Sequence, residues 1–194
     1  MNNNITNIMI VGVGGQGSLL ASRILGNAAL RLNHDVKVSE VHGMSQRGGS
    51  VVTYVKYGEK IYSPVICKGE ADIILAFEQL EALRWLPYLK KGGIIITSTY
   101  KINPAPVNAG AAEYPKDIIQ IISEMGIKII DVDAFALAQQ AGNDRASNVV
   151  LIGILAKLMK DSIDKKIYIE ALRESNPKIF NANLPAFNLG YDVG

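Results

Sequence analysis

Two glycine-rich stretches have the residue types and spacing that could bind a ligand. The first is Gly12-Val13-Gly14-Gly15-Gln16-Gly17, which matches G-x-G-x-x-G and follows the apolar run Ile8–Val13. Such glycines permit a tight turn and let a pyrophosphate approach the N-terminus of the next helix. A dinucleotide site also needs an acid about 20 residues further on, and Glu40 stands at such a distance. The turn could therefore hold a dinucleotide, hold another anion, or only pack a helix against a sheet.

The second stretch includes this acid and reads Ser39-Glu40-Val41-His42-Gly43-Met44-Ser45-Gln46-Arg47-Gly48-Gly49-Ser50. Its glycines let the backbone come close to a ligand or a partner. The Arg47 guanidinium can bind a phosphate or a carboxylate through two hydrogen bonds. A solvated arginine in a surface loop is the alternative. The candidate contact residues here are Glu40, Ser45, Gln46, Arg47, Gly48 and Gly49.

Other side chains that could do chemistry are few. The chain has two histidines, and His34 is predicted to be a solvated residue at a helix end. No lysine stands four residues after a tyrosine, as a short-chain reductase would require. Asp133 is expected to cap the N-terminus of a helix, although together with Asp131 it could form a metal pair. These observations argue against a complete dehydrogenase.

The single cysteine, Cys67, excludes several kinds of metal and redox site. One thiol cannot form an internal disulfide, a zinc ribbon or a four-thiolate iron–sulfur cluster. Cys67 itself is expected at the edge of the core. A formal net charge of +2 gives no reason to expect nucleic-acid binding, and no apolar run reaches the length of a membrane helix. We expect a cytoplasmic protein without a targeting segment that binds neither nucleic acid nor a membrane.

The elements that must position these residues alternate between strands and helices. The predicted strands are 8–13, 36–41, 50–57, 60–63, 72–77, 94–98 and 127–132, and the predicted helices are 18–32, 78–89, 115–125, 133–141, 148–160 and 163–173. Residues 50–63 are predicted as an antiparallel hairpin, 100–112 as a loop and 176–194 as a tail, and Gly92-Gly93 is expected to stop the 78–89 helix. This order predicts an α/β fold, a three-layer sandwich with a mostly parallel, Rossmann-like sheet, in one domain over residues 1–194.

Together, the two glycine-rich stretches resemble one family. GVGGQGSLLASRIL (residues 12–25) and SEVHGMSQRGGSV (residues 39–51) are similar to the gamma domain of the 2-oxoacid:ferredoxin oxidoreductases of the pyruvate/ketoisovalerate type. Within that family, the resemblance is closest to the separate small (beta) subunits of indolepyruvate:ferredoxin oxidoreductases. It continues through Ala71-Asp72, Lys91-Gly92-Gly93, Asn148-x-x-Leu151-x-Gly153 and Asn183-x-x-Ala186-Phe187-x-x-Gly190. It therefore covers almost the whole chain.

The resemblance implies a non-catalytic subunit that supports the oxidative decarboxylation of a 2-oxoacid, such as indolepyruvate or another aryl pyruvate. In this family coenzyme A accepts the acyl group and ferredoxin accepts the electrons. Thiamine diphosphate, magnesium and the [4Fe–4S] clusters lie on other domains or on a larger partner subunit. This sequence has no Gly-Asp-Gly signature of thiamine enzymes, which agrees with that division.

The resemblance also changes what the two glycine-rich stretches are expected to face. They would lie against the partner, the substrate channel or coenzyme A, and Gln46 and Arg47 are the preferred contacts. A stand-alone Rossmann-type module that binds a dinucleotide through Gly12–Gly17 and Glu40 is the alternative.

Overall fold

The centre of the molecule is a six-stranded sheet in the order β2-β3-β1-β4-β5-β6. The computed structural model describes residues 5–42 and 48–194, and the structural statements below concern these residues. The strands are β1 (Thr6–Val13), β2 (Asp35–His42), β3 (Ser50–Gly58), β4 (Ala71–Ala76), β5 (Leu89–Ser98) and β6 (Lys128–Val132). β1, β4, β5 and β6 are parallel, whereas β3 runs antiparallel to both β1 and β2. The predicted α/β class with a mostly parallel sheet is confirmed.

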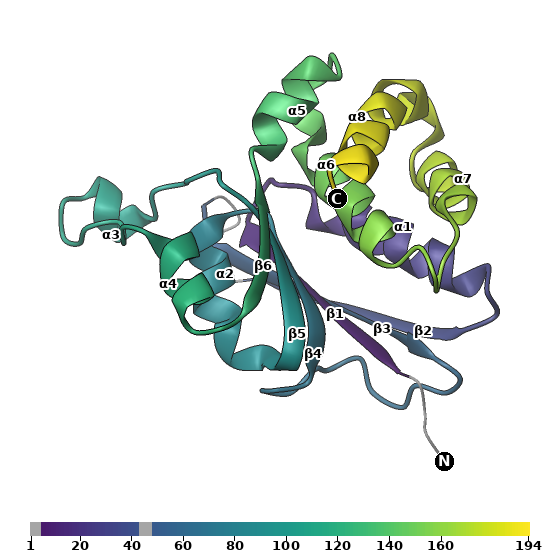
Figure 1. Cartoon of the computed structure of the whole chain (residues 1–194), viewed down its shortest axis with the longest axis horizontal. Coiled ribbons are helices and arrows are strands. Elements are labelled where there is room, and N and C mark those ends of the chain that lie inside the picture. The colour runs from purple at the N-terminus through teal and green to yellow at the C-terminus, as the bar shows by residue number, and fades with distance from the viewer. Residues whose placement is uncertain (1–4, 43–47) are drawn as a thin grey trace.

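Helices cover both faces of this sheet (Figure 1). One face carries α1 (Ser18–Leu30), α6 (Ser147–Leu158), α7 (Lys165–Ser175) and α8 (Phe180–Val193), with α5 (Ala134–Gln140) beside α6. The other face carries α2 (Gln79–Trp85) and α4 (Ile118–Glu124), and α3 (Ala105–Asn108) is a short turn at the outer end of that side. Short 3-10 turns span Leu86–Tyr88, Asp144–Ala146 and Pro177–Ile179. Within the described ranges, no helix is long and apolar enough to cross a bilayer.

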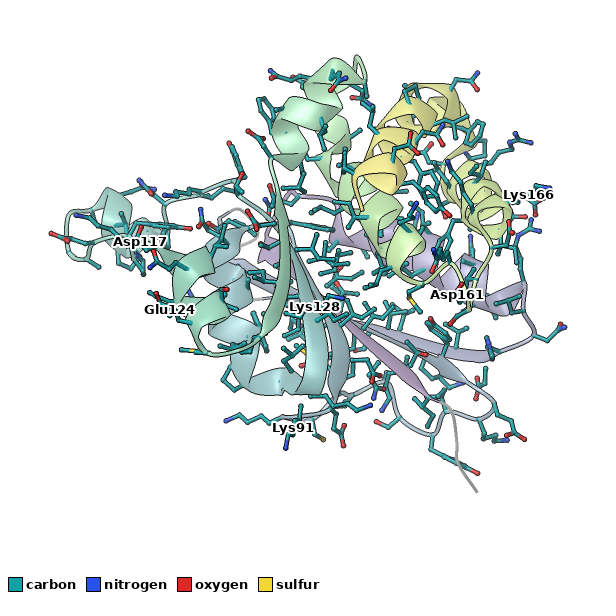
Figure 2. The ribbon with its side chains drawn as sticks, in the orientation of Figure 1. Lys91, Asp117, Glu124, Lys128, Asp161 and Lys166 are labelled. Atoms are coloured by element: carbon teal, nitrogen blue, oxygen red, sulfur yellow. The ribbon has the colours of Figure 1, made fainter. Side chains whose placement is uncertain are left out.

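The alternation of side chains along β1 explains the two apolar layers. Successive residues of a strand point to opposite faces of the sheet. Ile8 and Ile10 therefore join the core beneath α1, α6 and α8, while Met9 and Val11 join the core beneath α2 and α4. All four side chains are fully buried. Charged side chains such as Lys91, Asp117, Glu124, Lys128, Asp161 and Lys166 lie exposed around the outside (Figure 2).

The predicted hairpin at residues 50–63 is wrong in its second strand. β3 pairs with β2 on one side and with β1 on the other, so that Val52 lies between Val41 and Val11. Most of β3 is buried, as expected for a strand in the interior of the sheet. Residues 60–63 form no strand, and Tyr62 is 85% exposed. The antiparallel hairpin is instead made by β2 and β3.

The segment predicted as a C-terminal tail is instead a helix, α8, that lies against α6. The two helices meet at glycines, since a Cβ on Gly190 would overlap the Val150 carbonyl and a Cβ on Gly153 would lie 2.7 Å from the Tyr191 nitrogen. Small residues let two helix backbones approach closely. Gly190 in this segment is therefore explained by the close contact between α8 and α6, not by a loop.

Three smaller boundaries also differ from the predictions. The 78–89 helix ends at Trp85 rather than at Gly92-Gly93, because Pro87 has no N–H for a helical hydrogen bond, and Gly92 lies within β5. The predicted loop 100–112 contains the short turn α3. The helix predicted from Pro115 begins only at Ile118, after Asp117 in a left-handed conformation.

Candidate functional site

The first glycine-rich turn joins β1 to α1 at the carboxyl edge of the parallel strands, where α/β sheets form their sites. Here Gln16 lies across the ends of two strands. Its Oε1 accepts a hydrogen bond from the Val13 N–H at 2.7 Å, and its Nε2 donates to the Phe77 carbonyl at 3.1 Å. Gln16 thereby ties the end of β1 to the residue that follows β4. A Cβ on Gly12 would lie 2.7 Å from Gln16 Oε1 and 3.2 Å from the Phe77 Cβ, so a side chain there would displace the Gln16 amide.

Gly17 makes room for a residue from the far end of the chain. It precedes α1 with a φ of 83°. The Nδ2 of Asn148 donates to its carbonyl at 3.2 Å, and a Cβ on Gly17 would overlap that nitrogen. Asn148 lies in the first turn of α6 and is only 8% exposed. This glycine therefore has a packing role, whatever the turn binds.

Glu40 reaches the N-terminus of α1. Its Oε2 accepts hydrogen bonds of 2.8 Å from Ser18 Oγ and from Thr53 Oγ1. Because Ser18 is the first residue of α1, the carboxylate places negative charge at the positive end of the helix dipole. A pyrophosphate at the same end would be repelled by this charge. The acid stands at the distance that a dinucleotide site requires, but its position disfavours that ligand.

The described part of the second glycine-rich stretch lies beside the first. The Gly14 N–H donates to the Gly49 carbonyl at 3.0 Å. Gly48 has a φ of 76°, in the left-handed region that favours glycine. Ser50 donates to the buried carboxylate of Glu81 on α2, which fixes the start of β3. The predicted contacts Ser45, Gln46 and Arg47 lie outside the described residues.

A cavity of about 390 Å³ opens at this same edge of the sheet. It is lined by Gly15 and Gln16 of the first turn, Phe77 after β4, Ser98 at the end of β5 and Arg145 before α6. Its volume falls in the range of small-molecule sites. The structure therefore brings two of the predicted turn residues into one cavity with residues from four other segments.

The cavity combines aromatic rings with one cation. Tyr100 and Phe135, which are 49% and 38% exposed, stack with their ring centroids 6.1 Å apart and an angle of 28° between the planes. Phe77 and Leu151 are buried beside them. In the described part of the chain, no carboxylate pairs with Arg145 and none lines this cavity. Among the described residues, the cavity thus combines one cation without a carboxylate partner with apolar rings.

Reasoning from the sequence missed most of these cavity residues. Tyr100 and Phe135 lie 35 positions apart in segments without a motif, and only the fold brings them together. Arg145 lies in the 3-10 turn Asp144–Ala146, and no motif in the sequence marks it as a ligand contact. Asn148 belongs to a motif that carried the family resemblance, and that motif was the only signal for it.

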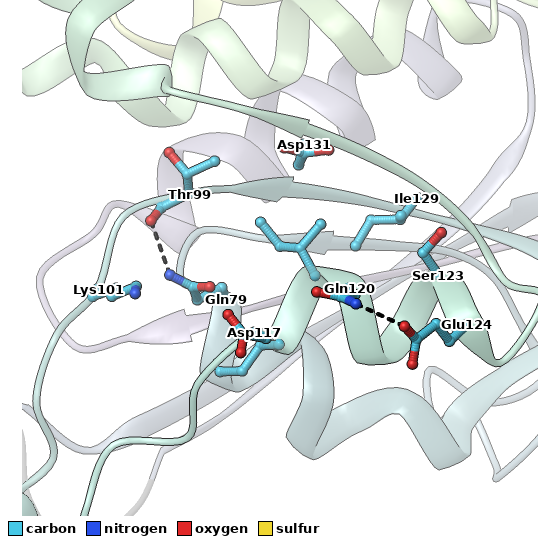
Figure 3. Close-up of a pocket in the computed structure, with 11 residues that line it drawn as sticks. Gln79, Thr99, Lys101, Asp117, Gln120, Ser123, Glu124, Ile129 and Asp131 are labelled. Atoms are coloured by element: carbon cyan, nitrogen blue, oxygen red, sulfur yellow. Dashed lines mark hydrogen bonds between the residues drawn. The ribbon is translucent and has the colours of Figure 1, made fainter.

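A second cavity, of about 720 Å³, lies between α4 and the β6 edge of the sheet (Figure 3). Its amide side chains already have partners: Gln79 Nε2 donates to the Thr99 carbonyl at 2.9 Å, and Gln120 Nε2 donates to Glu124 Oε1 at 2.8 Å. Its ionisable lining residues are Asp117, Glu124, Asp131 and Lys101. Three carboxylates against one lysine make this cavity unsuited to an acidic ligand.

A buried carboxylate holds the segment that leads to the first cavity. Glu78 is 1% exposed and caps α2 by accepting from the Glu81 N–H at 3.1 Å. It also accepts from the Ile102 N–H at 3.2 Å and from the Tyr114 hydroxyl. Burial raises the pKa of Glu78 above its ordinary value, although these hydrogen bonds oppose the change. Burial, together with the hydrogen bond to Glu78, raises the pKa of the Tyr114 hydroxyl far above its ordinary value.

The remaining candidates have mixed outcomes. Asp133 caps α5, as predicted, by accepting from the Ala136 N–H at 2.9 Å. In the ranges that the structure describes, no three His, Cys, Asp or Glu side chains group closely enough to hold a metal ion. The prediction for Cys67 is wrong, since it is exposed rather than at the core edge. The turn that carries it, residues 67–70, projects from the surface before β4 begins.

Comparison with known proteins identifies the family. The family profile described as "Pyruvate ferredoxin/flavodoxin oxidoreductase" matches residues 7–193. The chain belongs to the pyruvate ferredoxin/flavodoxin oxidoreductase family. It is 47% identical over 188 residues to "Indolepyruvate oxidoreductase subunit IorB" of Thermococcus kodakarensis, covering 95% of this chain and 93% of that one. The corresponding IorB subunit of Pyrococcus horikoshii is 46% identical with the same coverage.

Solved structures of this oxidoreductase family share the fold. The gamma subunit of a keto/oxoacid ferredoxin oxidoreductase from Geobacter sulfurreducens superposes with a TM-score of 0.69 at 22% identity, over 97% of each chain. The 2-oxoglutarate:ferredoxin oxidoreductase of Magnetococcus marinus has a TM-score of 0.68 at 18% identity, and the similar region is 31% of that longer chain. The same fold therefore occurs both as a separate subunit and as part of a larger polypeptide.

Proposed function

We propose that this chain is the small, non-catalytic subunit of a 2-oxoacid:ferredoxin oxidoreductase (EC 1.2.7 type) and that it acts as one domain over residues 1–194. In the proposed reaction, indolepyruvate or another aryl 2-oxoacid loses CO₂, coenzyme A takes the acyl group and ferredoxin takes the electrons. The observation that supports this proposal is the 47% identity to an indolepyruvate oxidoreductase subunit along 95% of the chain.

The side chains of this chain do not fit the cofactors of that reaction. A [4Fe–4S] cluster needs four thiolates, and the sequence has one cysteine. The described residues also offer no group of three metal-ligating side chains for the magnesium of thiamine diphosphate. We therefore assign thiamine diphosphate, magnesium and the clusters to a larger partner subunit in the cytoplasm, and no step of the chemistry to this chain.

The two glycine-rich stretches are the proposed contact region. The Gly14 N–H donates to the Gly49 carbonyl, so the described parts of the two stretches lie side by side at the carboxyl edge of the sheet. Contacts with the partner, the 2-oxoacid or coenzyme A are assigned to Gly12, Gly14, Gly15, Gln16, Gly17, Glu40, Ser45, Gln46, Arg47, Gly48 and Gly49.

Reconstitution tests this proposal. The chain is co-expressed with the large thiamine- and cluster-bearing subunit, and acyl-CoA formation and ferredoxin reduction are measured for indolepyruvate, phenylpyruvate, pyruvate, ketoisovalerate and 2-oxoglutarate. We expect activity only for the complex, with the aryl acids preferred. Decarboxylation by the isolated chain would contradict the proposal that the large subunit carries the chemistry. A preference of the complex for 2-oxoglutarate would contradict the proposed aryl 2-oxoacid substrate.

The alternative, a stand-alone dinucleotide-binding module, is tested by calorimetric titration with NAD. We expect no binding, because Glu40 places its charge at the α1 N-terminus, where the pyrophosphate would lie. Tight binding of NAD to the isolated chain would favour the module over the subunit.

A further inference from the structure

We infer that the cavity at the carboxyl edge of the sheet binds an aromatic carboxylate, that is, a flat ring carrying one anionic group. The cavity residues alone indicate this ligand class. The inference rests on the proposed function only in its choice of acid, because indolepyruvate is an aryl acid of this kind.

One side of the cavity is suited to a ring. Tyr100 and Phe135 form a stacked pair at the rim, and both keep a substantial exposed surface. Aromatic rings favour offset stacking or edge-to-face contact with a further ring. The buried side chains of Phe77 and Leu151 provide an apolar floor. No heavy atom lies within 4 Å of a Cβ position at Gly15, so the turn leaves open space beside the rings.

Other residues that line the cavity are suited to a single negative charge. Arg145 has no carboxylate partner among the described residues, and its planar guanidinium can bind a carboxylate through two hydrogen bonds. Helix α6 starts at the cavity with Ser147, without a side-chain cap and without an acid in its first turn. The positive end of its dipole is therefore not offset by a charge of its own helix.

Buried polar groups also line the cavity. Ser98 is 2% exposed, lines the cavity and accepts from the Tyr100 N–H at 3.2 Å. In the described ranges its hydroxyl hydrogen has no acceptor, so it is available to a ligand oxygen. The Asn148 amide, also buried at the cavity wall, is fixed through Gly17. The cavity thus has polar groups held in place before any ligand arrives.

The balance of charge favours a monoanion over a nucleotide. Arg145 is the one charged side chain among the described residues that line the cavity, which matches a single carboxylate, whereas a bisphosphate brings several charges. The larger cavity beside α4 has three carboxylates and one lysine, so its charge is unfavourable for an acidic ligand. The volume of about 390 Å³ accommodates an indole ring with a short acid side chain.

Isothermal titration of the full chain tests the inference, with indole-3-acetate as a stable aryl carboxylate. Indole supplies the ring without charge, acetate supplies the charge without a ring, and adenosine 3′,5′-bisphosphate represents a phosphorylated nucleotide. Arg145→Gln removes the cation, and Phe135→Leu removes one ring. Arg23→Gln is the matched control, because Arg23 is an exposed arginine of α1 that does not line the cavity.

We expect one molecule of indole-3-acetate to bind per chain, more tightly than indole or acetate. Arg145→Gln should raise its Kd about tenfold, Phe135→Leu should raise it severalfold, and Arg23→Gln should leave it unchanged. Equal binding to the Arg145→Gln protein, or tighter binding of the bisphosphate than of the aryl acid, would overturn the inference. Absence of aryl-acid binding in a chain whose complex oxidises indolepyruvate would reject this site alone. Binding by a chain that forms no active complex would reject the proposed function alone.

Discussion

The Nδ2 of Asn148 donates to the carbonyl of Gly17 at 3.2 Å and so joins the N-terminal turns of α1 and α6 across 131 positions of sequence. The contact brings the first glycine-rich turn against the cavity that Asn148 also lines. It also explains why the last glycine of the G-x-G-x-x-G pattern has no side chain, independently of any nucleotide.

Gly17→Ala is expected to lower the free energy of unfolding by about 3 kcal/mol, since it combines backbone strain at positive φ with displacement of the Asn148 amide. Gly15→Ala is the matched control. Gly15 also has a positive φ, but nothing lies within 4 Å of its Cβ position, so only the strain of about 1–2 kcal/mol should appear. Denaturant unfolding of the native protein, Gly17→Ala and Gly15→Ala measures the loss of unfolding free energy for each variant. Equal losses for the two variants would argue that Asn148 adds nothing.

The strand–helix alternation and the order of most elements could be predicted from the sequence, because buried strands such as β1 are continuous apolar runs. The partners of β3 could not. Its pattern predicts a strand but not which strands flank it, and the pairing with β1 depends on contacts between residues as distant as Thr6 and Tyr57. The helix α8 was missed for a similar reason, because its glycines are explained by α6 and not by local propensity.

The candidate site also has a part that could be predicted from the sequence and a part that could not. The two glycine-rich stretches are visible in the sequence because each is a local pattern. The aromatic pair of Tyr100 and Phe135 forms where the segment after β5 meets the first turn of α5, and no local pattern reports it. The role of Glu40 shows the limit of spacing alone: the distance from Gly17 matches a dinucleotide site, whereas its hydrogen bond from Ser18 gives the carboxylate a different partner.

Gly153→Ala should destabilise the fold by about 3 kcal/mol or more, because a methyl group would collide with the backbone of α8 at Phe187 and Tyr191. Gly26→Ala in α1 is the control. Its Cβ would lie 3.7 Å from Val36, an ordinary contact, so the substitution should instead stabilise the helix by about 0.5–1 kcal/mol. Thermal unfolding, monitored by circular dichroism, shows whether each substitution lowers or raises the stability of the protein. A stable Gly153→Ala protein would show that the contact between α6 and α8 can relax.

Stability should fall with rising pH through the titration of Glu78. Burial raises its pKa in the folded protein above the ordinary value of 4.5. The folded protein therefore holds this proton more tightly than the unfolded chain does. The resulting stabilisation is fully present below the ordinary value and is lost as the pH rises through the folded pKa. The difference in unfolding free energy between the native protein and Glu78→Gln, measured by denaturant titration, should show this slope.

Tyr114→Phe provides the matched variant for that measurement. The Tyr114 hydroxyl donates to Glu78, which favours the charged carboxylate. Its removal should raise the pKa of Glu78 further and move the loss of stability to higher pH. A pH profile identical to that of the native protein would contradict the assignment of the slope to Glu78.

Arg47→Ala should weaken assembly with the large subunit, or lower the activity of the complex, by about tenfold, because a guanidinium that binds a carboxylate or phosphate through two hydrogen bonds contributes on that scale. The free energy of unfolding of the isolated chain should stay the same. Titration calorimetry with the large subunit, ferredoxin-linked turnover and denaturant unfolding give the three values. Arg23→Ala, at an exposed position of α1, controls for the loss of a surface charge. Unchanged assembly and turnover would remove Arg47 from the contact region, whereas a loss shared by Arg23→Ala would indicate a general effect of charge.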